Sequence, residues 1–400
     1  MLEQKIRIVR RGEITLAALP PLALYVHLPW CLKKCPYCDF NSHQWRGDAA
    51  LAASDMEARY LDALCADLEA ALPLIWGRRI ASVFIGGGTP SLFAPEAIDR
   101  LIGDIRARLP LDAGCEITLE ANPGTFERER FRAFANAGVT RLSIGVQSFD
   151  DASLKAIGRV HDAAQARAAV AEAADSFASF NIDLMYALPG QTLLALSREL
   201  DQALAFKPPH LSIYHLTIEP NTLFAAAPPV LPDEDLASDM LDLIVQRTAA
   251  VGLARYEVSA FAQKGHACAH NLNYWRFGDY LGIGAGAHSK LSFPQRILRQ
   301  VRWREPAAYM THAAAGRAVS NEHEVGTDEL PFEFMLNALR LKDGFEMRLF
   351  PERTGLAMTA IDSAVEQAVR RGWLQCEGGV IKPSARGFDF LSEVQQLFLA

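Results

Sequence analysis

Between residues 22 and about 220, short runs rich in β-branched and aromatic residues alternate with longer stretches of helical period. Strands that alternate with helices are typical of a parallel sheet built from βα units. Six units are fewer than the eight of a closed (β/α)8 barrel, so we predict an α/β fold with an open (β/α)6 partial barrel. The strands are expected at Leu22–Leu28, Ser82–Ile85, Glu116–Glu120, Arg141–Val146, Asn181–Ala187 and His210–Ile218, and helices at Met56–Leu72, Pro95–Leu109 and Asp162–Ala174.

The rest of the chain divides around this barrel. Residues 1–21 form an N-terminal segment, residues 22–250 the barrel, residues 251–326 a connecting region, and residues 327–400 a separate C-terminal domain. A glycine turn between two short strands, flanked by helices, predicts a small α+β domain of winged-helix type. Its helices are expected at Glu329–Lys342, Gly355–Arg371 and Ser392–Leu399, and its strands at Trp373–Cys376 and Val380–Lys382.

The amino-acid composition limits the kinds of binding partner that we expect for the chain. It has 400 residues, half of them apolar, and a net charge of −7 without a basic run, which disfavours nucleic acid. Residues 388–400 contain neither lysine nor arginine, so the winged-helix pattern does not change that expectation. No apolar stretch approaches the ~20 residues of a membrane span. The early residues lack the apolar core of a signal peptide, so we expect a soluble, cytoplasmic protein.

Three cysteines stand close together just after the first expected strand, in Cys31-Leu-Lys-Lys-Cys35-Pro-Tyr-Cys38. Cysteine thiolates are the usual ligands of iron–sulfur clusters, and three of them can hold three irons of a [4Fe–4S] cluster. The fourth iron is then open to a ligand that is not protein. A structural zinc site is the alternative, with His27, Asp39 or His43 as fourth ligand. A disulfide is disfavoured, because the chain has seven cysteines and no secretory signal peptide.

A glycine-rich segment, Ile85-Gly-Gly-Gly-Thr-Pro-Ser91, follows the second expected strand. Glycines let the backbone approach a ligand closely, and free N–H groups there could bind a carboxylate or a zwitterion. Gly87, Gly88 and Thr89 are therefore candidate ligand-binding residues. The segment is not a Walker A loop. A tight strand-to-helix turn without any ligand is the alternative.

Polar residues also occur at or near the ends of later strands. Glu120 ends the third strand and Gln147 closes the fourth, while Asp183 lies inside the apolar fifth strand. A buried polar group without a partner costs ~1–3 kcal/mol, so these residues are expected to bind a ligand or another part of the protein. Arg159 could form a charge-assisted hydrogen bond to a carboxylate. For Glu120, simple solvent exposure in a loop is the alternative.

The segment His270-Asn-Leu-Asn-Tyr-Trp275 combines an imidazole with two large aromatic rings. A neutral imidazole is a common axial ligand of heme iron. Tyr274 and Trp275 offer flat apolar surface that suits a macrocycle. His266, Cys268 and His288 are alternative iron ligands. The segment could instead be an aromatic packing hinge between the barrel and the C-terminal domain.

Cysteines spaced C-x3-C-x2-C at the end of a first strand closely resemble the signature of the radical S-adenosylmethionine (SAM) superfamily. The resemblance implies that the amino and carboxylate groups of SAM chelate the fourth iron, and that the glycine motif holds the SAM amino group. The SAM-binding residues that it implies are Tyr25, Tyr37, Gly87, Gly88, Thr89, Glu120, Gln147, Arg159 and Asp183.

The match narrows to the branch of the oxygen-independent coproporphyrinogen III oxidases and extends over nearly the whole chain. Those oxidases typically have a further cysteine where this chain has Phe40, and a longer stretch before the cysteine motif. The segment His270–Trp275 is similar to the H-N-x-x-Y-W motif of the HemW-type heme chaperones in that branch. This resemblance implies a heme site at His270, Asn271, Tyr274 and Trp275.

Two functions follow from the resemblance. A heme chaperone would bind heme and pass it to apo-cytochromes of the respiratory chain, with the cluster and SAM in a structural or regulatory role that could be coupled to a homodimer. Contact with a membrane would then be peripheral. An oxidase would instead cleave SAM and decarboxylate coproporphyrinogen III. Phe40, the short N-terminal segment and His270–Trp275 favour the chaperone.

Overall fold

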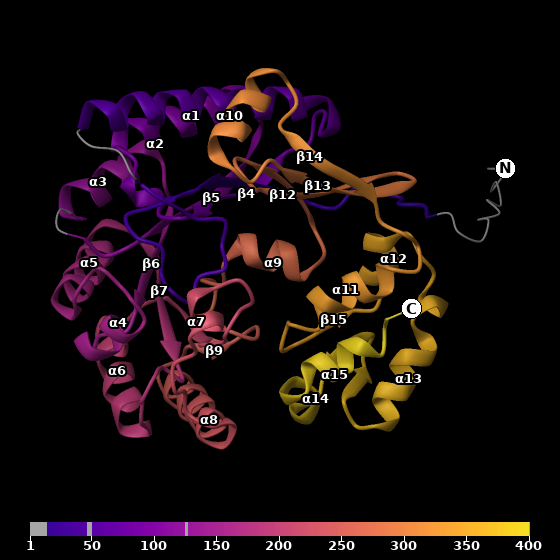
Figure 1. Cartoon of the computed structure of the whole chain (residues 1–400). Coiled ribbons are helices and arrows are strands. Elements are labelled where there is room, and N and C mark those ends of the chain that lie inside the picture. Colours follow the sequence, from indigo (N-terminus) through magenta and orange to yellow (C-terminus); the bar gives the residue numbers. More distant parts are fainter. Residues whose placement is uncertain (1–13, 46–49, 125–126, 400) are drawn as a thin grey trace.

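The computed structural model of the chain describes residues 14–45, 50–124 and 127–399, so most of the expected N-terminal segment lies outside it. The six predicted parallel strands stand side by side in chain order and do not close into a ring, which confirms the open barrel (Figure 1). They are β1 (Leu22–Leu28), β4 (Ile80–Gly87), β5 (Leu111–Ala121), β6 (Arg141–Gln147), β7 (Ser179–Tyr186) and β8 (His210–His215). The last strand ends three residues before the predicted Ile218, because the chain turns away ahead of Pro220.

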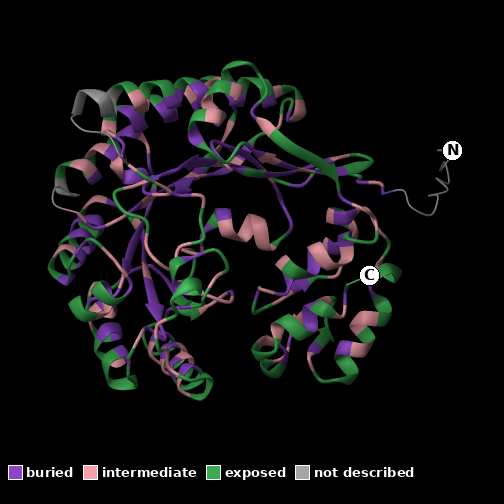
Figure 2. Ribbon diagram, in the orientation of Figure 1, coloured by how far each residue is buried: buried purple, intermediate pink, exposed green. Residues whose placement is uncertain are grey.

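Helices cover the outer face of this sheet, and its strands are buried almost throughout (Figure 2). Strands buried on both faces read as continuous apolar runs rather than as alternating ones, which explains why the sequence revealed them. Each covering helix buries one apolar stripe, as α2 does with Ile98, Leu101 and Ile105. The covering helices are α1 (Ala50–Ala71), α2 (Pro95–Arg108), α3 (Glu127–Ala137), α5 (Ala163–Ser176), α6 (Leu193–Ala205) and α8 (Glu234–Ala250).

Residues 251–326 extend the same sheet rather than merely connecting two domains. Strand β11 (Asp279–Ile283) pairs with β1 in parallel, and Leu22 lies opposite Asp279. Three antiparallel strands continue the sheet beyond it: β12 (His288–Phe293), β13 (Arg296–Arg302) and β14 (Val319–Glu324). Strands β10 (Ala260–Ala262) and β9 (Ala254–Arg255) extend the opposite edge, next to β8. Helix α9 (Ala269–Trp275) packs against β4, β1 and β11.

The C-terminal region packs around a second hydrophobic core, centred on Phe334, Phe345 and Phe350, to which Phe277 and Ile297 also contribute. The predicted hairpin is present as β16 (Leu374–Glu377) and β17 (Val380–Pro383), and β15 (Phe345–Glu346) adds a third strand. The predicted helix Gly355–Arg371 is wrong at its start, because Gly355 adopts φ +71° and ends the preceding helix. The helices are α11 (Leu330–Ala338), α12 (Leu349–Thr354), α13 (Asp362–Arg370), α14 (Ala385–Asp389) and α15 (Leu391–Gln396).

Short elements complete the fold around the strand ends. They are β2 (Trp30–Cys31), β3 (His43–Gln44), α4 (Asp151–Ala156), α7 (Leu223–Ala226), α10 (Pro306–Ala314) and the 3-10 turns Leu72–Leu74, Pro90–Leu92 and Met358–Ala360. Within the described part of the chain, every helix is too short or too polar to cross a lipid bilayer.

Candidate functional site

A cavity of about 590 Å³ lies at the carboxyl ends of the barrel strands, and we call it the cluster cavity. Ligands of open α/β sheets bind at this edge. The structure brings twelve of the residues predicted from the sequence to its lining: Cys31, Cys35, Cys38, Tyr37, Gly87, Gly88, Thr89, Glu120, Gln147, Arg159, Asp183 and Asn271.

The cysteine loop is held by short backbone pairings. Trp30 and Cys31 pair with His43 and Gln44, and the Cys38 N–H donates to the Cys35 carbonyl at 3.2 Å. Two side chains from other elements donate to the sulfurs: the Thr89 hydroxyl lies 3.5 Å from Cys31 Sγ, and Arg159 Nη1 lies 3.7 Å from Cys35 Sγ. Donors of this kind stabilise thiolates that bind a metal cluster.

The donor set of this loop fits a [4Fe–4S] cluster bound by three cysteines. All three thiols are free and line one cavity. Across residues 14–45, 50–124 and 127–399, no group of three or more histidine, cysteine or acidic side chains is arranged so that it could hold a single metal ion. For the zinc alternative, the His27 ring is already bonded on both sides, to the Tyr25 hydroxyl and to the Asn41 carbonyl, each at 2.9 Å.

The glycine segment packs closely against the strand that precedes the cysteines. Gly87 has φ +122°, and a Cβ there would come within 2.7 Å of the His27 ring. The N–H groups of Gly88 and Thr89 donate to the carbonyls of Leu28 and Trp30, at 2.8 and 2.7 Å. Our expectation that these N–H groups are free for a ligand is therefore wrong in this structure. The segment acts as a tight turn that leaves room in the cavity.

Glu120 is a half-buried residue near the end of β5, and its carboxylate reaches across to the neighbouring strand β4. Its Oε2 accepts a hydrogen bond from the Gly87 N–H at 3.0 Å. Burial, together with the charge of Asp183, raises the pKa of Glu120 to about 7. Simple solvent exposure, the alternative reading of this residue, does not hold. A carboxyl group that titrates near neutral pH in a cavity is a candidate for binding a ligand.

Asp183 belongs to a polar network across three neighbouring strands. The Ser143 hydroxyl donates to Asp183 Oδ2 at 3.2 Å, and Asn181 Nδ2 donates to Asp183 Oδ1 at 2.8 Å. Asn181 in turn is bonded to the His210 ring at 2.7 Å. Sequence analysis predicted a partner for Asp183 but did not identify Asn181 and His210, although both are polar residues within predicted strands.

Arg159 reaches into the cluster cavity from the turn after α4. Its Nη2 donates to Asn122 Oδ1 at 2.6 Å and to the Gly145 carbonyl, while its Nε is buried without a partner in the described structure. Gln147 lies nearby with φ +66°, a conformation that is rare for residues other than glycine. Strained residues often occur at ligand-binding sites.

The segment His270–Trp275 forms α9, and its histidine ring is fully engaged. His270 Nδ1 is bonded to the Ser82 hydroxyl and Nε2 to the Tyr274 hydroxyl, both at 3.0 Å, and the residue is only 1% exposed. The Trp275 ring lies under the guanidinium of Arg340, 4.2 Å from the ring centroid. These contacts agree with the packing alternative for His270 and Trp275, whereas Asn271 and Tyr274 line cavities.

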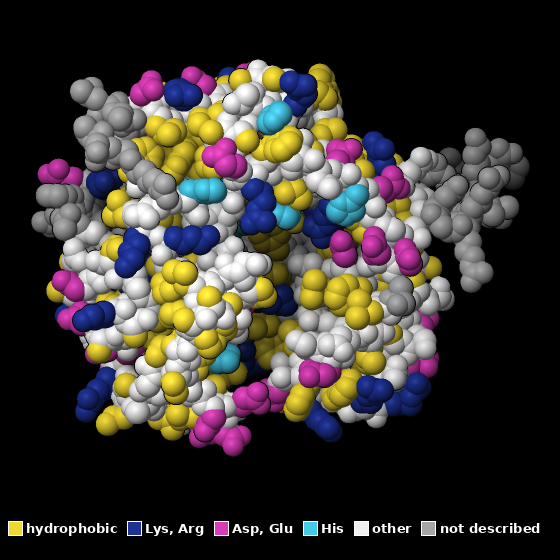
Figure 3. Space-filling view, viewed as in Figure 1, with side chains coloured by type: hydrophobic (Ala, Val, Ile, Leu, Met, Phe, Trp, Pro, Cys, Tyr) yellow, Lys and Arg dark blue, Asp and Glu magenta, His cyan; other side chains and the backbone are white. Residues whose placement is uncertain are grey.

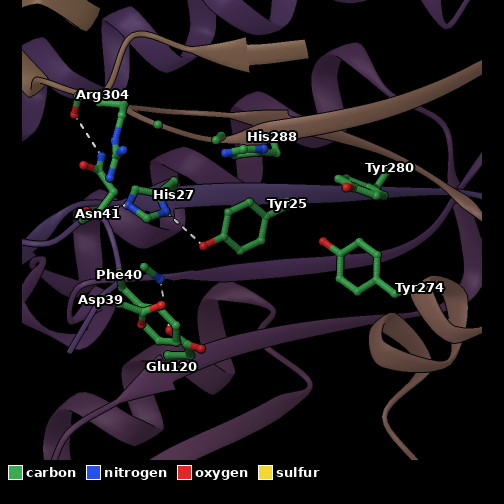
Figure 4. A pocket seen from close by; sticks show the side chains of 13 residues that line it. Tyr25, His27, Asp39, Phe40, Asn41, Glu120, Tyr274, Tyr280, His288 and Arg304 are labelled. Atoms are coloured by element: carbon green, nitrogen blue, oxygen red, sulfur yellow. Dashed lines mark hydrogen bonds between the residues drawn. The ribbon is translucent and has the colours of Figure 1, made fainter. Parts of the chain in front are cut away.

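A second cavity of about 420 Å³ adjoins the first, and we call it the aromatic cavity. Figure 4 shows Tyr25, Tyr274 and Tyr280 around it, with His288 facing the same space. Tyr25, predicted for SAM, lies here rather than in the cluster cavity. Tyr280 and Arg304 were missed, because their neighbourhood results from strands of the sheet extension. The full lining is Tyr25, His27, Asp39, Phe40, Asn41, Gly87, Glu120, Tyr274, Tyr280, Gly286, Ala287, His288 and Arg304.

Comparison with known families finds a match for the barrel and another for the C-terminal domain. A model described as the radical SAM superfamily matches residues 25–201, and a model described as the HemN C-terminal domain matches residues 327–390. Among solved structures, coproporphyrinogen III oxidase (HemN) from Escherichia coli, a radical SAM enzyme, superposes with a TM-score of 0.79. That match covers 95% of this chain and 90% of the other at 23% identity, so it supports the fold alone.

Two curated relatives are similar over nearly their whole length. The heme chaperone HemW of Escherichia coli is 46% identical over 384 residues, which is 96% of this chain and 99% of that protein. The heme chaperone HemW of Haemophilus influenzae is 44% identical over 383 residues, covering 95% of this chain and 98% of the relative. Together with the cysteine motif, the open barrel and the C-terminal domain, this likeness shows that the chain belongs to the HemW family of the radical SAM superfamily.

Proposed function

We propose that this protein is a cytoplasmic heme chaperone that binds heme beside a [4Fe–4S] cluster and SAM, and passes the heme to hemoproteins of the respiratory chain. The full-length likeness to relatives named heme chaperones carries the proposal. Cys31, Cys35 and Cys38 would hold the cluster, which gives SAM an iron to chelate when it is bound. Glu120, Gln147, Arg159 and Asp183 would line the SAM site.

The arrangement of the two cavities supports this division of tasks. The cluster cavity is lined by thiols, carboxylates and arginines, which suit a cluster and a charged amino-acid ligand. The aromatic cavity presents three tyrosine rings, which suit a flat macrocycle. Asp39, Phe40, Gly87 and Glu120 line both cavities, so ligands in the two would lie next to each other.

The decisive experiment uses anaerobically reconstituted, reduced protein. One sample receives SAM with coproporphyrinogen III, and a second is titrated with heme. We expect a saturable heme spectrum in the second sample and no vinyl-bearing product in the first. Formation of that product with stoichiometric methionine would instead make the protein an oxidase, and a heme titration that never saturates would exclude the chaperone.

SAM affinity should rise with pH, because the ionised Glu120 carboxylate accepts stronger hydrogen bonds from the charged ligand than the protonated carboxyl group does. Below its pKa of about 7 the carboxyl group is protonated, and above it the group is charged. The ionised fraction therefore increases about tenfold between pH 6 and pH 8, and the affinity should follow. Equilibrium dialysis of SAM against the cluster-loaded protein across this range measures the effect.

The Glu120→Gln variant is the control for this pH dependence. Glutamine keeps nearly the same shape and its side-chain oxygen can accept the Gly87 hydrogen bond, but it does not titrate. We expect weaker SAM binding and a flat profile between pH 6 and pH 8. A tenfold rise that persists in this variant would assign the titration to another group.

A further inference from the structure

The histidines and the cysteine that could bind heme iron differ in how far their lone pairs are engaged. Both ring nitrogens of His270 and both of His27 have hydrogen-bond partners. Cys268 is buried, and its thiol donates to Glu116 Oε1 at 3.6 Å. Burial raises the pKa of Cys268 to about 11, so it stays a neutral thiol at neutral pH, and the thiolate is the metal ligand.

The rings of His266 and His288 have no such partner among the described residues, and of these two only His288 lines the aromatic cavity. His288 begins strand β12, where its side chain is exposed and lines the aromatic cavity. Its ring forms no hydrogen bond with any residue that the structure describes. The cavity wall still shields part of the ring from water, and this partial desolvation, with the charges of Arg299 and Arg304, lowers the pKa of His288 below the usual value, so the imidazole is neutral at pH 7. A neutral imidazole has the lone pair that heme iron requires.

The backbone holds His288 rigidly at the cavity. His288 pairs with Val301 of β13, and a Cβ on the neighbouring Gly282 would come within 2.1 Å of the His288 carbonyl. The turn that leads into His288 is closed by Asn41, whose Nδ2 donates to the carbonyls of Ala285 and Arg304, at 2.9 and 2.8 Å. A ligand on a rigid strand start keeps its position when the iron binds.

The walls of the cavity suit a porphyrin. Tyr274 packs edge-on against Tyr280 with ring centroids 4.6 Å apart, and Tyr25 lies stacked on Phe84. Burial raises the pKa of both Tyr25 and Tyr274, so their rings stay neutral. The hydrogen bond between the His270 ring and the Tyr274 hydroxyl holds that hydroxyl in place, which makes His270 a positioning residue for this wall.

Charge at the cavity mouth fits the acidic edge of heme. Arg304 is exposed there and forms no ion pair with another described residue, so its guanidinium is available to a carboxylate. The acidic residues Asp39 and Glu120 lie on the side away from His288 in Figure 4. Figure 3 shows this part of the surface hollowed, with hydrophobic side chains inside and basic and histidine side chains along its edge.

We propose that heme binds in the aromatic cavity with its iron on His288, a propionate on Arg304 and the macrocycle against Tyr25, Tyr274 and Tyr280. This inference rests on the proposed heme-chaperone function and assigns its binding site. The cavity is open, and Phe40 at its mouth is 61% exposed, so the bound heme would keep an accessible edge. An accessible edge is what a protein that hands heme to another protein requires.

Heme titration of the full-length protein tests the assignment. We expect His288→Ala to change the Soret and visible bands and to weaken heme affinity on the order of 10- to 100-fold. Added imidazole should restore the original bands in this variant. His288→Cys should give the bands of a thiolate ligand. His323→Ala, on the exposed face of β14, should bind heme as the unchanged protein does.

The His270→Ala variant separates a ligand from a positioning residue. We expect it to bind heme more weakly while the band positions, which report the iron ligand, stay unchanged. Unchanged bands and affinity in His288→Ala, or a lost ligand signature in His270→Ala, would overturn the assignment while heme binding itself stands. Failure of the unchanged protein to saturate with heme would overturn the proposed function and this site with it.

Discussion

The Cys35→Ala variant should lose nearly all of its iron–sulfur cluster. Three thiols line the cluster cavity, and removing one leaves two protein ligands for a cluster that needs three. Changes outside the ligand shell already cost about 10- to 100-fold in metal affinity, so loss of a ligand should cost at least that. Iron and sulfide content and the visible absorbance after anaerobic reconstitution measure the effect.

Cys376→Ala is the matched control for this prediction. Cys376 is an exposed, free cysteine on β16 of the C-terminal domain, so its loss changes the cysteine count but not the cavity. It should take up the full cluster. Heme binding should survive in part in Cys35→Ala, because no cysteine lines the aromatic cavity. A full cluster in Cys35→Ala would show that the ligand assignment is wrong.

The sequence revealed the barrel because its strands are continuous apolar runs between helices of regular period. β1 was predicted at its true bounds, Leu22–Leu28, and the residues at the strand ends converge because parallel strands end at one edge. The sheet extension was harder to see. Strands such as β14, Val-Ser-Asn-Glu-His-Glu, are polar and mostly exposed, so they have no apolar run to detect.

The engagement of His270 could not be inferred from the sequence. The Ser82 hydroxyl that occupies its Nδ1 lies 188 residues away in the chain, and only the packing of α9 on β4 brings the two together. Arg304 and Tyr280 reach the aromatic cavity through the same kind of long-range pairing. Sequence motifs therefore identified the residues expected near the cluster. Which histidine nitrogens already have hydrogen-bond partners could be learned only from the folded structure.

The Asp279→Ala variant should lose about 3–5 kcal/mol of unfolding free energy. Asp279 is fully buried and pairs with Arg78 at 2.8 Å and Lys290 at 3.0 Å, so its removal leaves the buried Lys290 and the largely buried Arg78 without their anionic partner. Burial would raise its pKa, but Lys290 and Arg78 lower it below the ordinary value. Its contribution is therefore complete above ~3.9, the ordinary aspartate pKa, and is lost as the pH falls below that value.

Asp112→Ala provides a closely matched comparison. Asp112 pairs with Arg79, the neighbour of Arg78, at 2.6 Å, but the two side chains are 43% and 60% exposed. A solvent-exposed pair contributes about 0–1 kcal/mol, so Asp112→Ala should unfold at nearly the same denaturant concentration as the unchanged protein. Equal losses in the two variants would show that burial does not decide the strength of these pairs.

The ion pair also connects stability to the proposed heme site. Asp279 begins β11, which pairs with β1, and Lys290 lies opposite Tyr280 on the neighbouring strand. The same pairing therefore fixes Tyr280 and, two residues before Lys290, His288. We expect Asp279→Ala to weaken heme binding while Asp112→Ala leaves it unchanged, since only the first variant loosens the strands that form the aromatic cavity. Heme affinity that is unaffected in Asp279→Ala would mean that the cavity does not depend on this pairing.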